Sequence, residues 1–318
     1  MAKFIVTVRS VSGDTFGGDL GSRVRYLVVP NGQSPLPSQE IGFKAWAKQV
    51  MATFSPNPQG ATQRDLLLYV HGFNEDIAAV AGAHGEIATG LASNNFECTT
   101  ISFDWPSQGI PFAYLEDASQ AKISAVDLVN SCVKPMLASQ ADDCRIAIHV
   151  LCHSMGAYVV REALDHADDG SKTATNWTLN QLVVIAGDVE AADFVDGDKN
   201  TDSMLLHCYR LTNYFNLYDE VLQISNAKRL GVAPRLGRVG LPANAPQKTV
   251  NIDCSSWFEI TYGAEGLDPI ARAELSHSWY FGDARFYADL AATLRGTVDR
   301  TVAASRGVGV GRTLTLSA

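Results

Sequence analysis

A serine stands at the junction of a predicted strand and a predicted helix, in the segment Cys152-His153-Ser154-Met155-Gly156. The apolar run Ile146–Leu151 precedes this segment, and a helical pattern begins directly after it. A strand-to-helix turn of this kind exposes a serine hydroxyl as a nucleophile for acyl transfer. The turn is strained, so the residues two positions before and after the serine must be small. Gly156 meets that need, and Cys152 is small but stands where glycine is usual. The pattern therefore predicts Ser154 as a nucleophile, with one departure.

A serine nucleophile needs a general base, because its hydroxyl reacts weakly at neutral pH. Among the seven histidines of the chain, His277 follows the last predicted strand, after a loop, where the base of such a site is expected. His153 adjoins the serine, but consecutive residues of the turn point in different directions, so we expect it to support the turn. We expect His149 to be buried in its strand and His71 to brace the turn after the first central strand. The sequence therefore predicts His277 as the base.

Two aspartates are candidates for the acid that orients this histidine. Asp219 follows the apolar run Leu211–Phe215, and Asp188 follows the run that precedes it. The acid usually stands after the second strand beyond the serine, which favours Asp219, but the earlier strand is also used. Each aspartate has an alternative interpretation as an exposed loop carboxylate or a helix N-cap. We predict Asp219 as the acid, with Asp188 as the alternative and Glu220 as a neighbouring substitute.

The oxyanion that forms during acyl transfer needs preorganised N–H donors. One is expected from the backbone of Met155, directly after the serine, and the other from the backbone of Phe73, after the first central strand. Gly72 would let that backbone approach a substrate closely. Asn74 and Trp105 are candidates for the substrate pocket, although a large aromatic side chain such as Trp105 is equally expected in the core.

Six short apolar runs alternate with helical patterns through the middle of the chain, which is typical of a parallel sheet with helices on both faces. The runs are Asp65–Val70, Cys98–Phe103, Ile146–Leu151, Leu182–Ala186, Leu211–Phe215 and Val250–Cys254. Functional residues of such sheets gather at the carboxyl ends of the strands, which is where the candidates stand. Two β-rich runs, Phe4–Val8 and Arg25–Val29, predict a hairpin-like antiparallel pair at one edge of the sheet.

The chain of 318 residues, 46% of them hydrophobic, is long enough for one large α/β core. No linker-like stretch divides it, so we expect one domain, with edge strands in residues 1–64, a catalytic core in 65–295 and a C-terminal tail in 296–318. The formal net charge of −9 argues against nucleic acid as a partner. No apolar run approaches the roughly 20 residues that span a bilayer. The N-terminus shows no secretory pattern, so a cytoplasmic location is expected.

Neither a metal nor a cofactor is expected. The six cysteines have no metal-binding spacing and are expected as small core residues. The acidic stretch Asp193–Asp202 lacks the spacing of a calcium loop. Four basic residues between the predicted acid and base indicate a solvated loop, with contact to an acidic substrate as the less favoured alternative: Lys228, Arg229, Arg235 and Arg238.

An ordered set of motifs resembles a bacterial α/β-hydrolase family catalogued as a domain of unknown function. The motifs are LYVHGFN at 68–74, FDWPS at 103–107, Tyr114 with Asp117, HSMG at 153–156, PRLG at 234–237, and His277-Ser278 followed by an aromatic residue. The resemblance extends from about Asp65 to Leu290 and implies the α/β-hydrolase fold, a mostly parallel sheet flanked by helices. It also implies a Ser-Asp-His triad, whose roles fall by position on Ser154, Asp219 and His277.

These observations together predict a serine carboxylesterase that acts on a small-molecule ester through an acyl-enzyme on Ser154. The connection between Asp188 and Leu211 is short, which indicates an open site and short to medium acyl chains, although residues 222–247 could fold over it. Acyl transfer and thioester or amide hydrolysis would use the same residues and stay open as alternatives. A catalytically inactive binding module on the same scaffold is the less favoured alternative.

Overall fold

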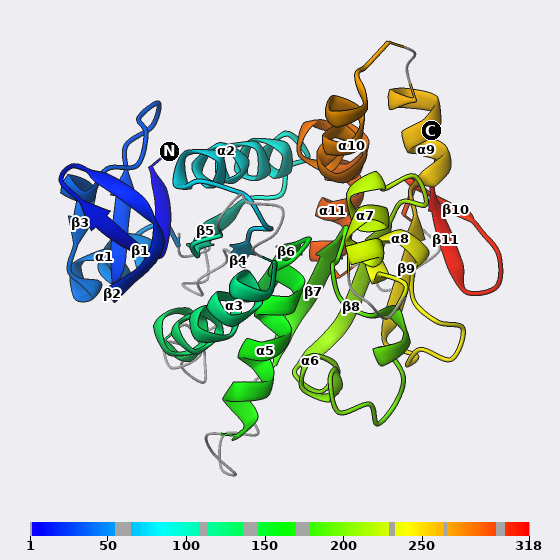
Figure 1. The fold of residues 1–318 in the computed structure, drawn as a ribbon, viewed down its shortest axis with the longest axis horizontal. Coiled ribbons are helices and arrows are strands. Elements are labelled where there is room, and N and C mark those ends of the chain that lie inside the picture. The colour runs from blue at the N-terminus through cyan, green and yellow to red at the C-terminus, as the bar shows by residue number, and fades with distance from the viewer. Residues whose placement is uncertain are drawn as a thin grey trace, which may run out of the picture.

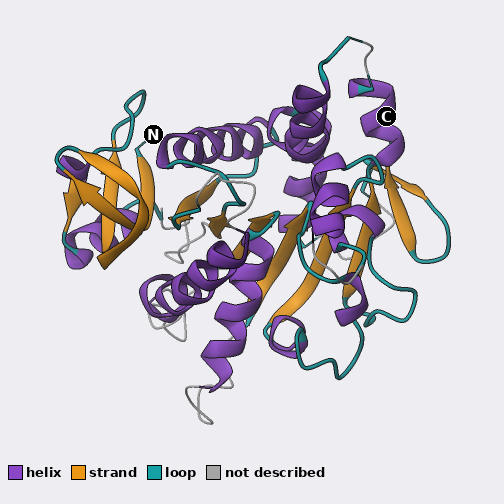
Figure 2. Ribbon diagram, in the orientation of Figure 1, coloured by secondary structure: helices purple, strands orange, loops and turns teal. Residues whose placement is uncertain are grey.

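One mixed sheet runs through the protein (Figures 1 and 2). Its strands contribute alternate side chains to cores on both of its faces. The computed structural model describes residues 2–54, 65–107, 114–135, 146–169, 178–228, 233–263, 266–296 and 303–317. Within them the sheet has eleven strands in the order β10-β11-β9-β8-β7-β6-β4-β5-β1-β2-β3. The strands are β1 (Lys3–Ser12), β2 (Thr15–Val29), β3 (Glu40–Ile41), β4 (Asp65–Val70), β5 (Cys98–Asp104), β6 (Ile148–His153), β7 (Leu179–Ile185), β8 (Cys208–Phe215), β9 (Thr249–Asp253), β10 (Arg306–Val308) and β11 (Thr313–Leu316).

The central strands β5, β4, β6, β7, β8 and β9 are all parallel to their neighbours. Their apolar runs are continuous because both faces are buried, as the alternation along β4 shows. Leu66, Leu68 and Val70 belong to the core on one face, whereas Leu67 and Tyr69 belong to the core on the other. The expected α/β class, with a mostly parallel central sheet flanked by helices, is confirmed.

Helices cover both faces of this sheet (Figure 2). Side chains of α1 (Phe43–Met51), α3 (Tyr114–Leu128) and α5 (Gly156–Asp169) pack into the first core, and those of α2 (Ile77–Ser93), α9 (Ser255–Tyr262) and α11 (Ala284–Leu294) pack into the second. The remaining helical segments are η1 (Pro37–Gln39), the π-helical turn η2 (Val129–Val133), η3 (Ala191–Asp193), α6 (Asp202–Leu206), α7 (Glu220–Lys228), α8 (Leu236–Val239), α10 (Pro269–Ser278) and η4 (Trp279–Gly282).

The first strand lies further inside the sheet than the sequence predicted. β1 pairs antiparallel with β2, as expected for a hairpin, but its other edge pairs parallel with β5. The hairpin is therefore continuous with the central sheet. One consequence concerns Arg9 of β1, which reaches the end of β5 and ion-pairs with Asp104, with 2.9 Å between its Nε and Oδ1.

The edge of the sheet opposite β3 is formed by the C-terminal tail, for which the sequence predicted no strand. β10 and β11 form a hairpin, and β11 pairs parallel with β9. Asp289, buried on α11, holds this hairpin in place by pairing with Arg306 at 2.7 Å. The same carboxylate accepts hydrogen bonds from Tyr214 and Ser305.

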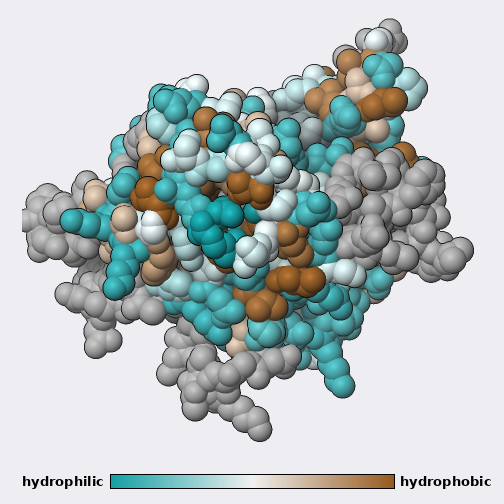
Figure 3. All heavy atoms as spheres, turned by 60° about the vertical axis from the view of Figure 1, so that its left-hand side comes forward, coloured by the Kyte–Doolittle hydropathy of each residue, from teal (hydrophilic) through white to brown (hydrophobic). Residues whose placement is uncertain are grey.

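The outer surface has no extended apolar face on the side shown in Figure 3, where apolar residues form separate patches among hydrophilic ones. Single exposed apolar residues of this kind are ordinary for a folded domain. Within the described parts of the chain, no helix has the length and apolarity needed to cross a bilayer.

Candidate active site

The turn around Ser154 connects the central strand β6 to α5 in a strained conformation. β6 extends through His153, two residues beyond the predicted strand end, and α5 begins at Gly156. Ser154 has φ of 53°, in the left-handed region that residues other than glycine rarely adopt. The end of the neighbouring strand β7 and the segment after it hold this turn, because Ser154 N donates to Ile185 O at 3.1 Å and Asp188 N donates to Ser154 O at 3.0 Å. Strain that is maintained in this way is typical of functional turns.

Two glycines allow the turn to pack closely against the end of β4. A Cβ added at Gly156 would lie 2.4 Å from the carbonyl oxygen of Val70. One added at Gly72 would lie 2.9 Å from Ser154 Cβ. The backbone of the 71–74 turn therefore passes directly beside Ser154, which is where a second oxyanion donor would have to lie.

Cys152 occupies the position where glycine is usual without disturbing this packing. Its side chain is fully buried, and its thiol donates to Val183 O at 3.4 Å. Burial raises the pKa of the Cys152 thiol far above its ordinary value. The residue is therefore an inert part of the core rather than a competing nucleophile.

The structure brings Asp219 and His277 into direct contact. Nδ1 of His277 donates to Oδ2 of Asp219 at 2.7 Å, and both side chains are buried. The other carboxylate oxygen of Asp219 accepts from Leu222 N at 2.9 Å and so caps the start of α7. Asp219 is thus an N-cap as well as the partner of the histidine, and the cap fixes the direction of its carboxylate.

His277 follows β9 in the chain, as the sequence predicted, and is the penultimate residue of helix α10. The helical pattern is weak here because α10 buries few of its residues, chiefly Ser276 and His277. The ring of His153 lies against the ring of His277, with 4.8 Å between their centroids, which places His277 beside the turn that carries Ser154. Nε2 of His153 also donates to the carbonyl oxygen of His277 at 3.2 Å.

Several carboxylates act on the proton affinity of His277. Burial alone would lower the pKa of this histidine, but the charge and hydrogen bond of Asp219, together with the charges of Asp188 and Glu75, outweigh it. The pKa of His277 therefore lies above its ordinary value. A neutral His277 that donates from Nδ1 has a lone pair on Nε2 and can accept a proton there.

Asp188, the alternative acid, has a different partner. Its Oδ1 lies 3.3 Å from Nε of Arg235, and both side chains are buried. The prediction that Arg235 lies in a solvated loop is therefore wrong. Arg235 is carried inward because α8 packs on the end of β7, where a Cβ on Gly237 would lie 2.1 Å from the backbone carbon of Ala186. Of the other basic residues, Arg229 lies outside the described residues.

The two residues proposed for the substrate pocket lie in different surroundings. Trp105 is fully buried in the first core, and its indole N–H donates to His71 O at 3.0 Å, which fits the core interpretation. Asn74 is exposed, with φ of 62°. Of the two predicted oxyanion donors, Phe73 is half-buried in the same turn and Met155 is fully buried.

A buried polar group supports the turn that contains Phe73 and Asn74. His71 donates from Nδ1 to Gly72 O at 2.8 Å and accepts from Trp105 N on Nε2 at 3.0 Å. Asp104, paired with Arg9, lies 3.4 Å from His71 Nε2. Burial would raise the pKa of Asp104, but Arg9 and His71 outweigh it and lower this pKa. The motif residues at the ends of β4 and β5 therefore brace one another.

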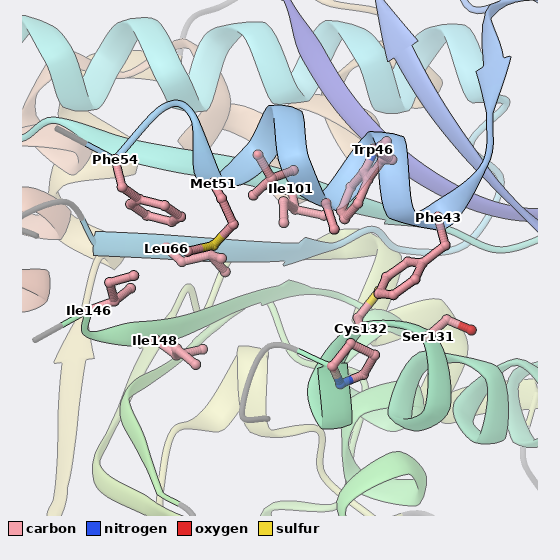
Figure 4. Close-up of a pocket in the computed structure, with 13 residues that line it drawn as sticks. Phe43, Trp46, Met51, Phe54, Leu66, Ile101, Ser131, Cys132, Ile146 and Ile148 are labelled. Atoms are coloured by element: carbon pink, nitrogen blue, oxygen red, sulfur yellow. The ribbon is translucent and has the colours of Figure 1, made fainter. Parts of the chain in front are cut away.

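An apolar cavity of about 70 Å³ lies away from this site, between α1 and the sheet (Figure 4). Figure 4 shows Phe43, Trp46 and Met51 of α1 on one side of it and Leu66 and Ile148 on the other. Leu66 and Ile148 stand at the starts of β4 and β6, whereas Ser154 follows the end of β6. The cavity therefore belongs to the opposite end of the sheet.

No group of three or more His, Cys, Asp or Glu side chains is placed to hold a metal ion within the residues that the structure describes. Tyr114 begins α3, but the side chains of Tyr114 and Asp117 lie outside what is described, as does Cys144.

Three residues at the site were not singled out from the sequence: Glu75, Asn216 and Ser276. Glu75 directly follows the HGFN motif, and its Oε1 lies 3.7 Å from His153 Nδ1. Asn216 precedes Asp219 by three residues and donates from Nδ2 to Ser276 O at 3.1 Å. Ser276 Oγ accepts from Glu220 N at 3.0 Å, which ties α10 to the start of α7. The available signal was position: Glu75 and Ser276 directly adjoin a predicted site residue or motif, and Asn216 directly follows the strand that precedes Asp219.

Comparison with known proteins places the sequence within one family model. Residues 48–261 match the model described as "Alpha/beta hydrolase of unknown function (DUF900)". No curated protein sequence matches the chain.

Solved structures with a similar fold are distant. Acyl-protein thioesterase 2 from Zea mays has 16% identity and a TM-score of 0.35, covering 72% of this chain and 96% of that one. A cutinase-like protein from Cryptococcus sp. has 12% identity and a TM-score of 0.34, covering 76% and 97%. Lipase B from Aspergillus fumigatus has 13% identity and a TM-score of 0.33, covering 58% and 44%. Similarity this low says nothing about the reaction of this chain.

Proposed function

We propose that this chain, which belongs to the α/β-hydrolase family of unknown function, is a serine hydrolase that cleaves carboxylic esters. The observation that carries the proposal is the 2.7 Å contact between His277 and Asp219, next to a serine held at φ of 53°. A nucleophile on a strained turn, a histidine beside it and a carboxylate on the far ring nitrogen are the parts that acyl transfer requires.

In the proposed reaction, the Oγ of Ser154 attacks the carbonyl carbon of the ester. At the same time, Nε2 of His277 accepts the proton of the Ser154 hydroxyl. Asp219 holds the imidazole in the tautomer that can accept this proton and stabilises the imidazolium that forms. The N–H groups of Met155 and Phe73 stabilise the negative charge on the carbonyl oxygen. His277 then gives its proton to the leaving alcohol, and a water activated by the same histidine releases the acid.

The connection between β7 and β8 bears on the size of the substrate. It holds only the short segments η3 and α6, and the described part after α7 turns inward at Arg235. Neither the β7–β8 connection nor the described part after α7 supplies a large helical cap, so we propose short to medium acyl chains as substrates. Asn74 would lie on the exposed side of the site.

A fluorophosphonate probe and a panel of esters test this function. We expect the probe to label the wild-type protein and the Ser154→Ala variant to lose both labelling and ester hydrolysis. Failure of the wild type to react with either would refute the proposal, and labelling that survives in Ser154→Ala would refute the nucleophile. Thioesters, amides and competing acyl acceptors in the same panel distinguish a thioesterase, an amidase or an acyltransferase from an esterase.

A further inference from the structure

The turn after β4, residues 71–75, carries the Phe73 N–H that is the proposed second oxyanion donor. This turn is strained, because Asn74 has φ of 62°, in the left-handed region that residues other than glycine rarely adopt. Backbone in such a conformation persists only where its surroundings hold it. The contacts at the two ends of the turn therefore determine where the Phe73 N–H points.

His71 holds the start of the turn through the peptide group between Gly72 and Phe73. Its Nε2 accepts from Trp105 N, so the proton of the neutral ring lies on Nδ1, which donates to Gly72 O at 2.8 Å. The carbonyl of Gly72 and the N–H of Phe73 belong to one planar trans peptide and point in opposite directions. A fixed carbonyl therefore fixes the direction of the Phe73 N–H.

The end of the turn is held by Arg9, which comes from β1. Nη2 of this guanidinium donates to the carbonyl oxygen of Glu75 at 2.6 Å and to that of Trp105 at 3.0 Å. One group thus joins the last residue of the turn to the segment after β5, to which His71 also bonds. Because Arg9 is buried, its two donated bonds are shielded from water.

A buried carboxylate holds Arg9 in this position. Nε of Arg9 donates to both oxygens of Asp104, at 2.9 and 3.0 Å, and Thr7 Oγ1 donates to Oδ2 of the same carboxylate at 2.5 Å. Oδ1 of Asp104 also lies 3.4 Å from Nε2 of His71, and the guanidinium prevents it from facing that nitrogen as an unpaired charge. A planar guanidinium donates from Nε and Nη2 in fixed directions, which an ammonium group cannot do.

From these contacts we propose that Arg9 is a positioning residue for the Phe73 N–H, because it holds the end of the turn while His71 holds the start. The proposal rests on the proposed function, in which this N–H stabilises the oxyanion. It goes beyond that function by assigning a role to the β1–β2 hairpin, since Arg9 lies outside residues 48–261, which match the family model.

Arg9→Lys tests the proposal, because lysine keeps a positive charge beside Asp104 but cannot reproduce the bonds of Nη2. The matched control is Arg306→Lys, which changes a guanidinium that is paired with the buried Asp289 at the opposite edge of the sheet. For both variants and the wild type, kcat and KM are measured with a p-nitrophenyl ester of a short acid. Urea unfolding shows whether each variant is folded.

A second readout reports on the oxyanion directly. A trifluoromethyl ketone with the acyl length of the ester adds the Ser154 hydroxyl to its carbonyl carbon and leaves a negative oxygen where the oxyanion would lie. Its Ki therefore measures how well the N–H donors are placed, because tight binding of such an analogue depends on interactions made in the transition state. A merely structural role for Arg9 would lower the urea midpoint and leave this Ki unchanged in the folded protein.

We expect Arg9→Lys to lower kcat by about 10²-fold, the lower end of the loss when an oxyanion donor is removed. KM should change little, because the donor acts on charge that develops in the transition state. Ki should rise by about the factor by which kcat/KM falls. The acid limb of the pH profile should stay in place, because His277 and Asp219 are unchanged. Arg306→Lys should lower the urea midpoint and keep the wild-type kcat and Ki.

An Arg9→Lys variant with the kcat and Ki of Arg306→Lys overturns the proposal. A shifted acid limb also overturns it, since the base rather than the donor would then have moved. Should Arg9→Lys fail to fold, the double variant Arg9→Met with Asp104→Leu replaces it, because removal of both members of a buried pair leaves no unpaired charge. Wild-type kcat and Ki in that double variant likewise overturn the proposal.

Two outcomes separate this inference from the proposed function. A wild-type protein that neither hydrolyses esters nor reacts with the fluorophosphonate probe overturns both together. An active wild type with an inactive Ser154→Ala variant and an unchanged Arg9→Lys variant overturns this inference alone.

Discussion

Replacing Asp219 with asparagine separates the two contacts that its carboxylate makes. One oxygen accepts from His277 Nδ1 at 2.7 Å and the other accepts from Leu222 N at 2.9 Å. Asparagine has one acceptor oxygen for these two donors, and it caps helices as well as aspartate does. The amide oxygen is expected to keep the cap, so that the amide NH₂ faces the imidazole and selects the opposite tautomer.

The opposite tautomer carries its proton on Nε2 and cannot accept one from Ser154. The corresponding change in a Ser-His-Asp enzyme lowers kcat by about 10⁴-fold, which corresponds to roughly 5 kcal/mol in the activation free energy. Because the cap survives, we expect the free energy of unfolding to change by less than about 1 kcal/mol. The Asp219→Asn variant is therefore expected to be folded and almost inactive.

Asp188→Asn gives the opposite result and serves as the control. Its partner Arg235 is buried, and the other carboxylate near this guanidinium, that of Glu190, lies 4.0 Å away on an exposed side chain. Loss of Asp188 therefore leaves the buried charge poorly paired, at a cost of up to about 3–5 kcal/mol. Activity per folded molecule should stay within about tenfold of wild type, since Asp219 accepts the Nδ1 hydrogen bond of His277 and so sets its tautomer. Ester hydrolysis and urea unfolding of both variants measure the two effects. The reasoning is refuted if Asp188→Asn loses activity by orders of magnitude and Asp219→Asn does not.

Three further predictions follow from other parts of the structure. The carboxylates around His277 raise its pKa, and this base accepts a proton only when its ring is neutral. We therefore expect kcat/KM to rise with pH through a midpoint above the pKa of an ordinary histidine, and a midpoint at or below that pKa would contradict the reasoning. Gly72→Ala places a Cβ 2.9 Å from Ser154 Cβ, so we expect fluorophosphonate labelling to fall by about 10²-fold or more, and labelling at the wild-type rate would show that the turn can shift. Asp289→Asn breaks the buried pair with Arg306 and should lower the free energy of unfolding by about 3–5 kcal/mol, whereas an unchanged urea midpoint would show that the β10–β11 hairpin contributes little.

Local patterns in the sequence were sufficient for the central sheet and the serine turn. Parallel strands buried on both faces are continuous apolar runs, so β4 and β5 are readable almost to the residue. The strand before Ser154 was placed two residues early, because Cys152 and His153 were assigned to the turn although the strand continues through them. That shift leaves the position of Ser154 at the strand-to-helix junction unchanged.

Partners that are distant in the chain could not be predicted in this way. The pairing of β1 with β5 depends on two segments about 95 residues apart, and neither contains a signal for the other. The β10–β11 hairpin comes from a tail rich in glycine and arginine. β11 alternates, with Leu314 and Leu316 buried, but this run of four residues contains no signal that β9 is its partner. The burial of Arg235 depends on the approach of α8 to the end of β7, so a basic cluster in the sequence was taken for a solvated loop.

The sequence by itself determined that Ser154 and the two aspartates follow the carboxyl ends of strands and that His277 comes after them in the chain. A strand and the turn after it are local features, so a local pattern is enough to place them. The tertiary structure decided which of two aspartates meets the histidine. Asp188 and Asp219 both follow parallel strands, but α8 brings a guanidinium to the first, and α10 brings an imidazole to the second. A carboxylate pairs with the donor that packing places beside it, and packing depends on segments remote in the chain.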